Sequence, residues 1–167
     1  MKPKSTSPTT RAGADGAPRL ALAEFLPYRL NVVAAVASEG LARTYGERFG
    51  IGVPEWRVLA TVGEFGSVTA KAIGFHAHMG KVKVSRAAAA LEARGLLCRR
   101  PNPEDGREAF LVLTPDGREM YEEVVPLALA YEARLKAALS RNEWDALNAI
   151  IDKLLACSRS SRLQGRN

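Results

Sequence analysis

Apolar residues recur every three or four positions along most of this chain, the spacing that gathers them on one face of an α-helix. The first such stretch covers residues 26–49, and Pro27 suits its first turn. A second helix begins near Pro54, and a third extends from its N-cap, Thr69, to about His76. The pattern therefore predicts three helices in the first half of the chain.

A fourth helix is predicted between Gly80 and Gly95, and its two faces differ in chemistry. Successive residues lie about 100° apart around a helix, which separates an apolar face from one that is basic, hydroxylic and small. The apolar face consists of Val84, Ala87, Ala88 and Leu91, and the opposite face of Val82, Lys83, Ser85, Arg86 and Ala89. This helix can bury one side and present positive charge on the other.

Residues 96–99 and 108–113 are predicted as strands, because apolar runs flank the turn-forming segment between them. Thr114-Pro115 then supplies an N-cap and a first-turn proline for a long helix that extends toward Leu139. Residues 140–143 form a capping box that begins a last helix. The predicted order is αααα-ββ-αα, a mostly α fold with a small β-hairpin.

We expect one folded domain at residues 21–157, preceded by a flexible arm and followed by a disordered tail. Residues 1–20 are rich in Pro, Ser, Thr, Gly and basic residues, and they bury too little apolar surface to offset the entropy of ordering. This basic arm either has no task or attracts phosphates without specificity. The tail at residues 158–167 is basic and polar.

The composition fits a cytoplasmic protein and suits a polyanionic partner, although an idle basic tail would give the same charge balance. The 24 Lys and Arg exceed the 18 Asp and Glu and leave a net charge of +6, which favours attraction to nucleic acids. The two cysteines, Cys98 and Cys157, make no disulfide framework and fit a reducing compartment. The sequence has no signal-peptide core and no apolar run long enough to cross a bilayer, so we expect no membrane partner.

No catalytic constellation stands out in the sequence. We find no Ser/His/Asp set, no carboxylate pair and no Gly-rich phosphate loop. The two histidines, His76 and His78, have no acidic or thiol partner at metal-ligand spacing. We therefore predict neither an enzyme nor a metal or cofactor site.

The short third helix, the tight turn and the basic fourth helix have the pattern of a helix-turn-helix, and the hairpin that follows has the pattern of a wing. On the first turns of the fourth helix, the residues that can contact DNA are Lys81, Lys83, Ser85 and Arg86. We assign base reading to Arg86, and positioning or mixed roles to Lys83 and Ser85. The alternative is a solvated polar face without a partner.

The hairpin carries a second set of candidate DNA contacts. Arg107 at its tip can enter a narrow minor groove, where negative potential is concentrated. Asp105 is expected to clamp the Arg107 guanidinium, although an Asp-Gly pair that only stabilises the turn has the same pattern. Arg99 and Arg100, at the foot of the hairpin, are expected to contact phosphates.

Two long helical regions, residues 25–50 and 115–157, flank the winged helix-turn-helix at residues 53–114. Both carry apolar stripes and are longer than a domain of this size needs to cap its core. We expect them to form a dimer interface between two copies of the chain, which would place two recognition helices about one DNA turn apart. Packing of these helices within one chain is the alternative.

Taken together with the wing, the sequence pattern resembles that of the MarR family of bacterial transcriptional regulators. The resemblance covers about residues 25–156, and its strongest element is the D-x-R wing followed by Leu113-Thr114. The matching segments are residues 53–74, 81–97 and 101–117. The resemblance implies a homodimer that represses genes from a near-palindromic operator in double-stranded DNA. Glu104 on the wing and the pair His76 and His78 depart from the family pattern.

The resemblance also implies release from DNA when a small phenolic or carboxylate compound binds between the dimer region and the DNA-binding lobe. An aromatic wall with an arginine suits an aromatic carboxylate, and our candidates for this effector site are Tyr28, Arg29, Arg43, Trp56 and Arg57. Core packing is the alternative role of Trp56. The expected effector is an aromatic acid or its CoA thioester.

The leading hypothesis is therefore a dimeric repressor that responds to a ligand. The first alternative is a DNA-binding regulator or architectural protein without small-molecule control, whose operator affinity would depend on salt but not on metabolites. A protein-binding winged helix is a further alternative, but it needs an apolar groove where the fourth helix carries outward Lys and Arg.

Overall fold

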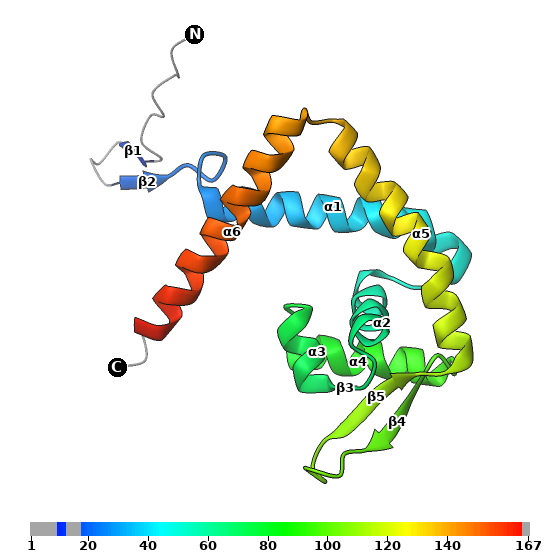
Figure 1. Cartoon of the computed structure of the whole chain (residues 1–167). Coiled ribbons are helices and arrows are strands. Elements are labelled where there is room, and N and C mark those ends of the chain that lie inside the picture. Colours follow the sequence, from blue (N-terminus) through cyan, green and yellow to red (C-terminus); the bar gives the residue numbers. More distant parts are fainter. Residues whose placement is uncertain (1–9, 13–17, 165–167) are drawn as a thin grey trace.

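The computed structural model describes residues 10–12 and 18–164 and shows a mostly helical chain with two small sheets (Figure 1). The helices are α1 (Leu26–Phe49), α2 (Val53–Phe65), α3 (Ala70–His76), α4 (Lys81–Ala93), α5 (Pro115–Ala137) and α6 (Arg141–Gln164). The strands are β1 (Thr10–Ala12), β2 (Pro18–Leu20), β3 (Val68–Thr69), β4 (Leu97–Pro101) and β5 (Ala109–Leu113). Within the described residues no helix has both the length and the apolar composition to span a membrane.

The predicted winged helix-turn-helix architecture is confirmed, with one strand added to its sheet. The two-residue strand β3 pairs antiparallel with β5, so that Val68 lies opposite Leu111 and Thr69 opposite Phe110. Because β4 pairs with the other edge of β5, the strand order is β3-β5-β4. Two residues are too few to show an alternating pattern, and the sequence therefore predicted only a two-stranded hairpin.

The two ends of the chain differ from expectation where the structure describes them. Residues 1–9, 13–17 and 165–167 lie outside the described part, so the flexibility of most of the predicted arm stays a prediction. Within that arm, β1 and β2 pair antiparallel. At the other end, α6 continues past the predicted domain end at residue 157 to Gln164, because no Pro or Gly interrupts it before Gly165.

The buried core lies between α2, α3, α4 and the β3-β5-β4 sheet, which together form the lobe. Its largest fully buried side chains are Tyr45, Val58, Leu59, Val62, Ile73, Val84, Leu91, Leu111 and Val124. Tyr45 and Phe49 come from the C-terminal end of α1, and Val124 comes from α5. Helices α1 and α5 are therefore each attached to the lobe by only part of their length.

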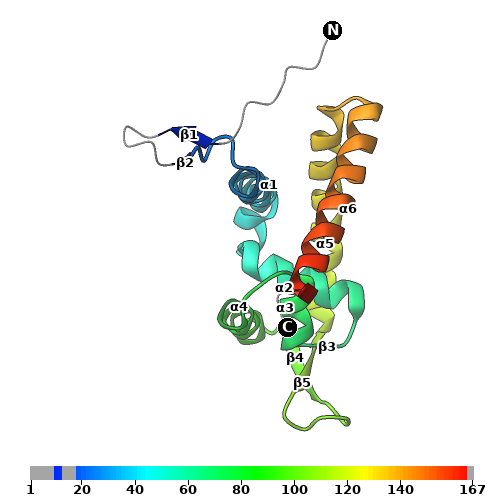
Figure 2. The same cartoon turned by 90° about the vertical axis from the view of Figure 1, so that its left-hand side faces the viewer.

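The remaining parts of α1 and α5, together with α6, leave the lobe and carry exposed apolar side chains. In Figure 1, α6 turns back after the end of α5 and descends to the level of the lobe, on one side of it, and Figure 2 shows the β4–β5 hairpin on the opposite side from the α5–α6 turn. The exposed apolar residues include Leu26, Leu30, Val33 and Val36 on α1, Leu129 and Leu135 on α5, and Leu147, Ile150, Ile151 and Leu155 on α6. We call this set the apolar face.

Three predicted helix caps are present. The Thr69 and Thr114 hydroxyl oxygens each accept a hydrogen bond from the backbone amide three residues later, at 3.2 and 3.0 Å. In the capping box of α6, the Glu143 carboxylate accepts hydrogen bonds from the hydroxyl and the backbone N–H of Ser140, at 2.7 and 2.8 Å. These two hydrogen bonds, the side-chain one first, hold the pKa of Glu143 below its usual value.

Close packing at two glycines attaches α5 to the lobe. Gly117 in the first turn of α5 lies against the backbone of Leu96, whose carbonyl oxygen leaves no room for a Cβ at position 117. One turn later, the Tyr121 ring covers Gly63 of α2, where a Cβ would lie 2.6 Å from the ring. The start of α5 is therefore held at a fixed position beside the wing strands and α2.

Candidate nucleic-acid interface

Helix α4 has the two faces that the sequence predicts. Its apolar residues Val84, Ala87, Ala88 and Leu91 are each at most 1% exposed, and they pack into the core of the lobe. The side chains at the start of its other face, Lys81, Lys83, Ser85 and Arg86, are exposed. Since these four apolar residues are held in the core, α4 is fixed with its basic side outward.

The turn between α3 and α4 is tight. The Ala77 N–H donates to the carbonyl of Ile73 at 2.8 Å, and the Met79 N–H donates to that of Gly74 at 3.0 Å. His78 has φ 49°, in the left-handed region that lets the chain reverse direction sharply. Met79 is buried beneath the turn. The angle between the two helices is therefore set by backbone hydrogen bonds and a buried anchor.

The wing consists of β4, β5 and the turn between them. At its tip the Asp105 carboxylate accepts a hydrogen bond from the backbone N–H of Arg107 at 2.9 Å, and the Asp105 carbonyl accepts one from Glu108 at 3.1 Å. No ion pair joins the Asp105 and Arg107 side chains among the described residues. The structure thus shows the turn-stabilising alternative and not the expected clamp, because the short Asp side chain reaches the amide two residues on.

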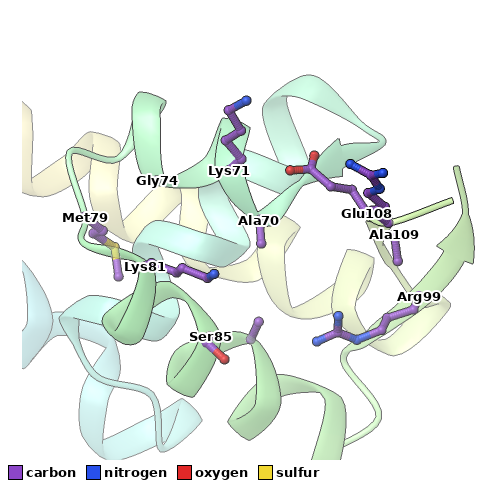
Figure 3. Close-up of a pocket in the computed structure, with 11 residues that line it drawn as sticks. Ala70, Lys71, Gly74, Met79, Lys81, Ser85, Arg99, Glu108 and Ala109 are labelled. Carbon is purple, nitrogen blue, oxygen red and sulfur yellow. The ribbon is translucent and has the colours of Figure 1, made fainter. Parts of the chain in front are cut away.

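A concave surface of about 540 Å³ lies between α4 and the wing, and we call it the wing hollow (Figure 3). Four cationic side chains line it, namely Lys71 of α3, Lys81 of α4, Arg99 of β4 and Arg107 of the wing tip. Figure 3 shows Lys81 and Arg99 extending toward its middle from α4 and β4, and Lys71 pointing outward at its rim. Several cations around one hollow concentrate positive potential where a polyanion would lie.

Two charged residues that line the hollow, Lys71 and Glu108, were not among the sequence candidates. Lys71 was missed because α3 was interpreted only as the support of the fourth helix, although its charge in the first turn of a helix-turn-helix was an available signal. Glu108 also lines the hollow and adds a negative charge to it. The sequence places Glu108 next to Arg107, the predicted minor-groove residue, but it does not show that the Glu108 side chain lines the hollow.

Arg99 and Arg100, which the sequence grouped together, have different surroundings. The Arg99 guanidinium donates two hydrogen bonds to the Glu92 carboxylate, from Nε to Oε1 at 2.7 Å and from Nη2 to Oε2 at 3.1 Å. Arg100 is exposed and lies opposite Phe110 in the strand register. Successive strand residues face opposite sides of a sheet, so of the two only Arg99 belongs to the wing hollow.

The chain matches a family model described as MarR family over residues 49–108, from the end of α1 to the wing tip. It is also similar to the uncharacterized HTH-type transcriptional regulator YwoH of Bacillus subtilis. The two are 30% identical over 125 residues, which cover 75% of this chain and 87% of YwoH. The chain belongs to the MarR family.

Two solved structures show the same MarR-family fold. The regulator Sco3205 of Streptomyces coelicolor, solved in complex with DNA, is 22% identical with a TM-score of 0.71, covering 83% of this chain and 90% of that one. BpsR of Bordetella bronchiseptica, whose DNA binding is regulated by 6-hydroxynicotinic acid, is also 22% identical with a TM-score of 0.71, covering 81% and 96%. As a member of the MarR family, the chain is a DNA-binding transcriptional regulator and not an enzyme.

Beside the recognition helix of this MarR-family lobe lies a smaller hollow of about 280 Å³, which we call the crevice. Its walls are formed by Ser38 and its neighbours on α1, by the first turns of α2 with Arg57, and by Lys83 of α4. The Arg57 guanidinium donates a hydrogen bond to the Ser38 hydroxyl at 3.1 Å. The predicted effector residue Arg57 therefore lies between α1 and α4.

The structure does not bring the five effector candidates together. Trp56 packs between the tilted ring of Tyr45 and the stacked ring of Tyr121, with ring centroids 5.6 and 6.3 Å away, which is the core-packing alternative. The other three candidates, Tyr28, Arg29 and Arg43, are exposed on α1 and lie outside the lining of the crevice. Only Arg57 of the predicted set lines it.

Tyr45 places a buried polar atom next to this region. Its hydroxyl is fully buried, without a hydrogen-bond partner among the described residues. Burial raises the pKa of Tyr45 to about 12, although the nearby positive charge of Arg57 acts in the opposite direction. The phenol therefore stays protonated, and neutral, throughout the physiological range.

Proposed function

We propose that this MarR-family regulator is a homodimeric repressor that binds a near-palindromic operator and is released by a small aromatic carboxylate or its CoA thioester. The observation that carries the proposal is the position of the crevice. One of its walls is α1, which continues into the apolar face, and another contains Lys83 of the recognition helix. A ligand in the crevice would contact both the proposed dimer region and the DNA-reading helix.

The apolar face supports the dimer. It spans three helices, and Val33 and Ile150 on it are 66% and 54% exposed in the single chain. Exposed apolar side chains in this number are typical of an interaction site, and a two-fold axis lets the same surface serve both partners. A second copy that covers this face would also supply the second winged-helix lobe that a near-palindromic operator requires.

The orientation of α4 and the wing supports the mode of DNA binding. With its basic face outward, α4 can lie in a major groove, where Arg86 reads a base and Ser85 and Lys83 position the helix. The exposed Arg107 at the wing tip can then reach the neighbouring minor groove. Lys71 adds a cation at the rim of the wing hollow for phosphate contact.

Arg107→Ala is expected to lower operator affinity by about ten- to hundredfold, because it removes the only proposed minor-groove contact of each subunit. Gel-shift titration measures the affinity, and sedimentation should show an unchanged oligomeric state. Arg141→Ala is the matched control, since it removes the same charge from an exposed position at the start of α6. Equal affinities of the two variants would remove the wing from the mechanism.

Arg57 and Lys83 support the assignment of a carboxylate to the crevice. Arginine binds carboxylates through two parallel hydrogen bonds, and the Ser38 hydroxyl that it now contacts is a further polar partner. The structural relative BpsR responds to 6-hydroxynicotinic acid, which is an aromatic carboxylate. At about 280 Å³ the crevice is slightly smaller than the usual range of ligand pockets, about 300–1,000 Å³, which favours the free acid over the thioester.

The proposed release mechanism is a population shift. A carboxylate that pairs with Arg57 and Lys83 would draw Lys83 away from DNA and favour lobe positions that do not match the operator. The loss of operator affinity then equals the difference in ligand affinity between the two lobe positions. The same coupling requires that operator DNA weakens binding of the ligand.

Arg57→Gln is expected to retain operator binding and to lose release by aromatic acids, because the variant keeps a polar side chain but lacks the charge. The probes are 6-hydroxynicotinate and benzoate, with gel shift for release and thermal shift for direct binding. Arg43→Gln is the control, since Arg43 is exposed on α1 outside the crevice. If no acid alters operator binding of the unmodified protein, the alternative of a regulator without small-molecule control is favoured.

A further inference from the structure

The only ion pair inside the DNA-facing part of the lobe, among the described residues, joins the recognition helix to the wing. Glu92 lies in the last turn of α4 and Arg99 lies on β4, and two parallel hydrogen bonds connect their charged groups. This geometry is the bidentate arginine–carboxylate arrangement, which fixes direction as well as distance. The Glu92 side chain is 24% exposed and that of Arg99 is 54% exposed, so the pair is partly screened from water.

The strand pattern explains why Arg99 reaches α4. Alternate residues of a strand share a face, so Arg99 points to the same side of the sheet as Leu97, which is 3% exposed in the core. On α4, Ser85 and Ala88 line the wing hollow, and Glu92 follows at the next position of the same helical stripe. Arg99 thus extends the core-facing side of β4 beyond the core and meets the end of that stripe.

Among the described residues, the Glu92–Arg99 pair, which we call the strut, is the only side-chain hydrogen bond or ion pair between α4 and the wing strands. The chain passes from α4 to β4 through Gly95, which has φ 71°, and Leu96. The Leu96 N–H donates to the Leu91 carbonyl at 2.9 Å, but these contacts lie at the base of the wing. The tip of the hairpin extends away from the lobe (Figures 1 and 2). Arg99 lies opposite Leu111, which is fully buried and pairs on its other side with Val68 of β3. The strut thus joins α4 to the sheet at the edge of the core, where the outer hairpin begins.

We propose that Glu92 and Arg99 are positioning residues that set the separation between the basic face of α4 and Arg107, and that Arg99 is not a phosphate contact. The inference rests on the proposed binding mode, in which α4 and the wing enter neighbouring grooves. Arg99 was predicted from the sequence to contact phosphate, but in the structure its guanidinium already engages a carboxylate. The wing is held at the angle that lets both elements reach one duplex.

A purely electrostatic role and a positioning role of Glu92 predict opposite changes in operator affinity for Glu92→Gln. If only charge mattered, Glu92→Gln would strengthen binding to any DNA, because it removes a negative charge beside the wing hollow. If Glu92 positions the wing, the same substitution weakens operator binding, by about three- to tenfold for a partly exposed bidentate pair. Tighter binding by Glu92→Gln in a gel-shift titration would overturn the proposal.

Salt dependence separates the roles of Arg99. A lost phosphate contact reduces the slope of log affinity against log salt by about 0.9, whereas a lost strut lowers affinity and leaves the slope unchanged. Arg99→Gln is therefore expected to keep the slope of the unmodified protein. The swapped pair Glu92→Arg with Arg99→Glu keeps the net charge and should recover most of the lost affinity. The positioning role would be contradicted by a reduced salt slope in Arg99→Gln. It would also be contradicted if the swapped pair bound the operator more weakly than both single variants.

Hydrogen exchange of the β4–β5 amides tests the strut without DNA. Glu92→Gln and Arg99→Gln should each raise exchange in the outer hairpin by about the same factor, since either removes the whole link. Arg100→Gln is the matched control, because it removes the same charge from the neighbouring position on the other side of the strand. If exchange rises as expected but the protein binds no operator, the proposed DNA-binding mode is wrong, whereas the link between Glu92 and Arg99 still holds the wing. If exchange in both variants equals that of Arg100→Gln, the proposed positioning role of Glu92 and Arg99 is wrong.

Discussion

Ile150→Glu is expected to convert the proposed dimer into monomers and to weaken operator binding by about a hundredfold or more. Ile150 is exposed in the single chain and lies in the apolar stripe of α6 with Leu147, Ile151 and Leu154. A carboxylate placed in a buried apolar interface loses its hydration without gaining a partner. A monomer then holds only one winged-helix lobe, so the second half-site no longer contributes to affinity.

Analytical ultracentrifugation measures the oligomeric state, and gel shift with a full operator and with a half-site measures the effect on DNA binding. Ala149→Glu is the matched control. It adds the same charge to the same helix one residue away, at an exposed position, and the helical period directs it away from the apolar stripe. The proposed interface requires that the two variants differ. An Ile150→Glu protein that remains a dimer would exclude α6 from the interface.

Gly117→Ala is expected to lower the free energy of unfolding by about 1–3 kcal/mol or more. An added Cβ would overlap the carbonyl oxygen of Leu96, which is a backbone atom and cannot rotate away. The same oxygen accepts a hydrogen bond from the Thr114 N–H at 3.2 Å, so relief of the overlap must also disturb the start of α5. Alanine is otherwise the better residue in a helix, by about 1 kcal/mol, and a loss of stability would therefore isolate the steric effect.

Denaturant unfolding of both proteins at one concentration measures this change, since the stability of a dimer depends on concentration. Gly106→Ala is the control, because a Cβ at that position meets nothing within 4 Å and its φ is not in the left-handed region. Its unfolding free energy should stay within about 0.5 kcal/mol of that of the unmodified protein. Equal unfolding free energies of the two variants would mean that the backbone around Leu96 and Gly117 shifts at little cost to make room for the added Cβ.

The helices were predictable because the signals that define them are local. The proline and glycine boundaries of α1, the Thr69 and Thr114 caps and the Ser140 capping box each act within a few residues. The amphipathic pattern of α4 likewise follows from its own sequence. Strand β3 was not predicted, since it is a strand only through its pairing with β5, more than forty residues later in the chain.

The cations of α4 and the wing were predictable in identity but not in arrangement. Residue type and helical period indicate that α4 and the wing tip are basic, and the structure exposes those side chains. The partner of Arg99 depends on the tilt of the wing against α4, and no spacing rule pairs a helix residue with a strand residue across Gly95. The turn role of Asp105 was one of two alternatives that the sequence could not separate, because both use the same residues.

The sequence alone was enough to identify a winged helix-turn-helix of the MarR type, with its basic recognition helix and its long flanking helices, because periodicity, caps and charge are properties of neighbouring residues. Tertiary structure decided which side chains share a site. It placed Arg57 with Ser38 and Lys83 in the crevice, left Tyr28, Arg29 and Arg43 outside it, and linked Glu92 to Arg99. Such groupings depend on how whole helices and strands pack against one another, and packing brings together residues whose spacing in the chain carries no record of their contact.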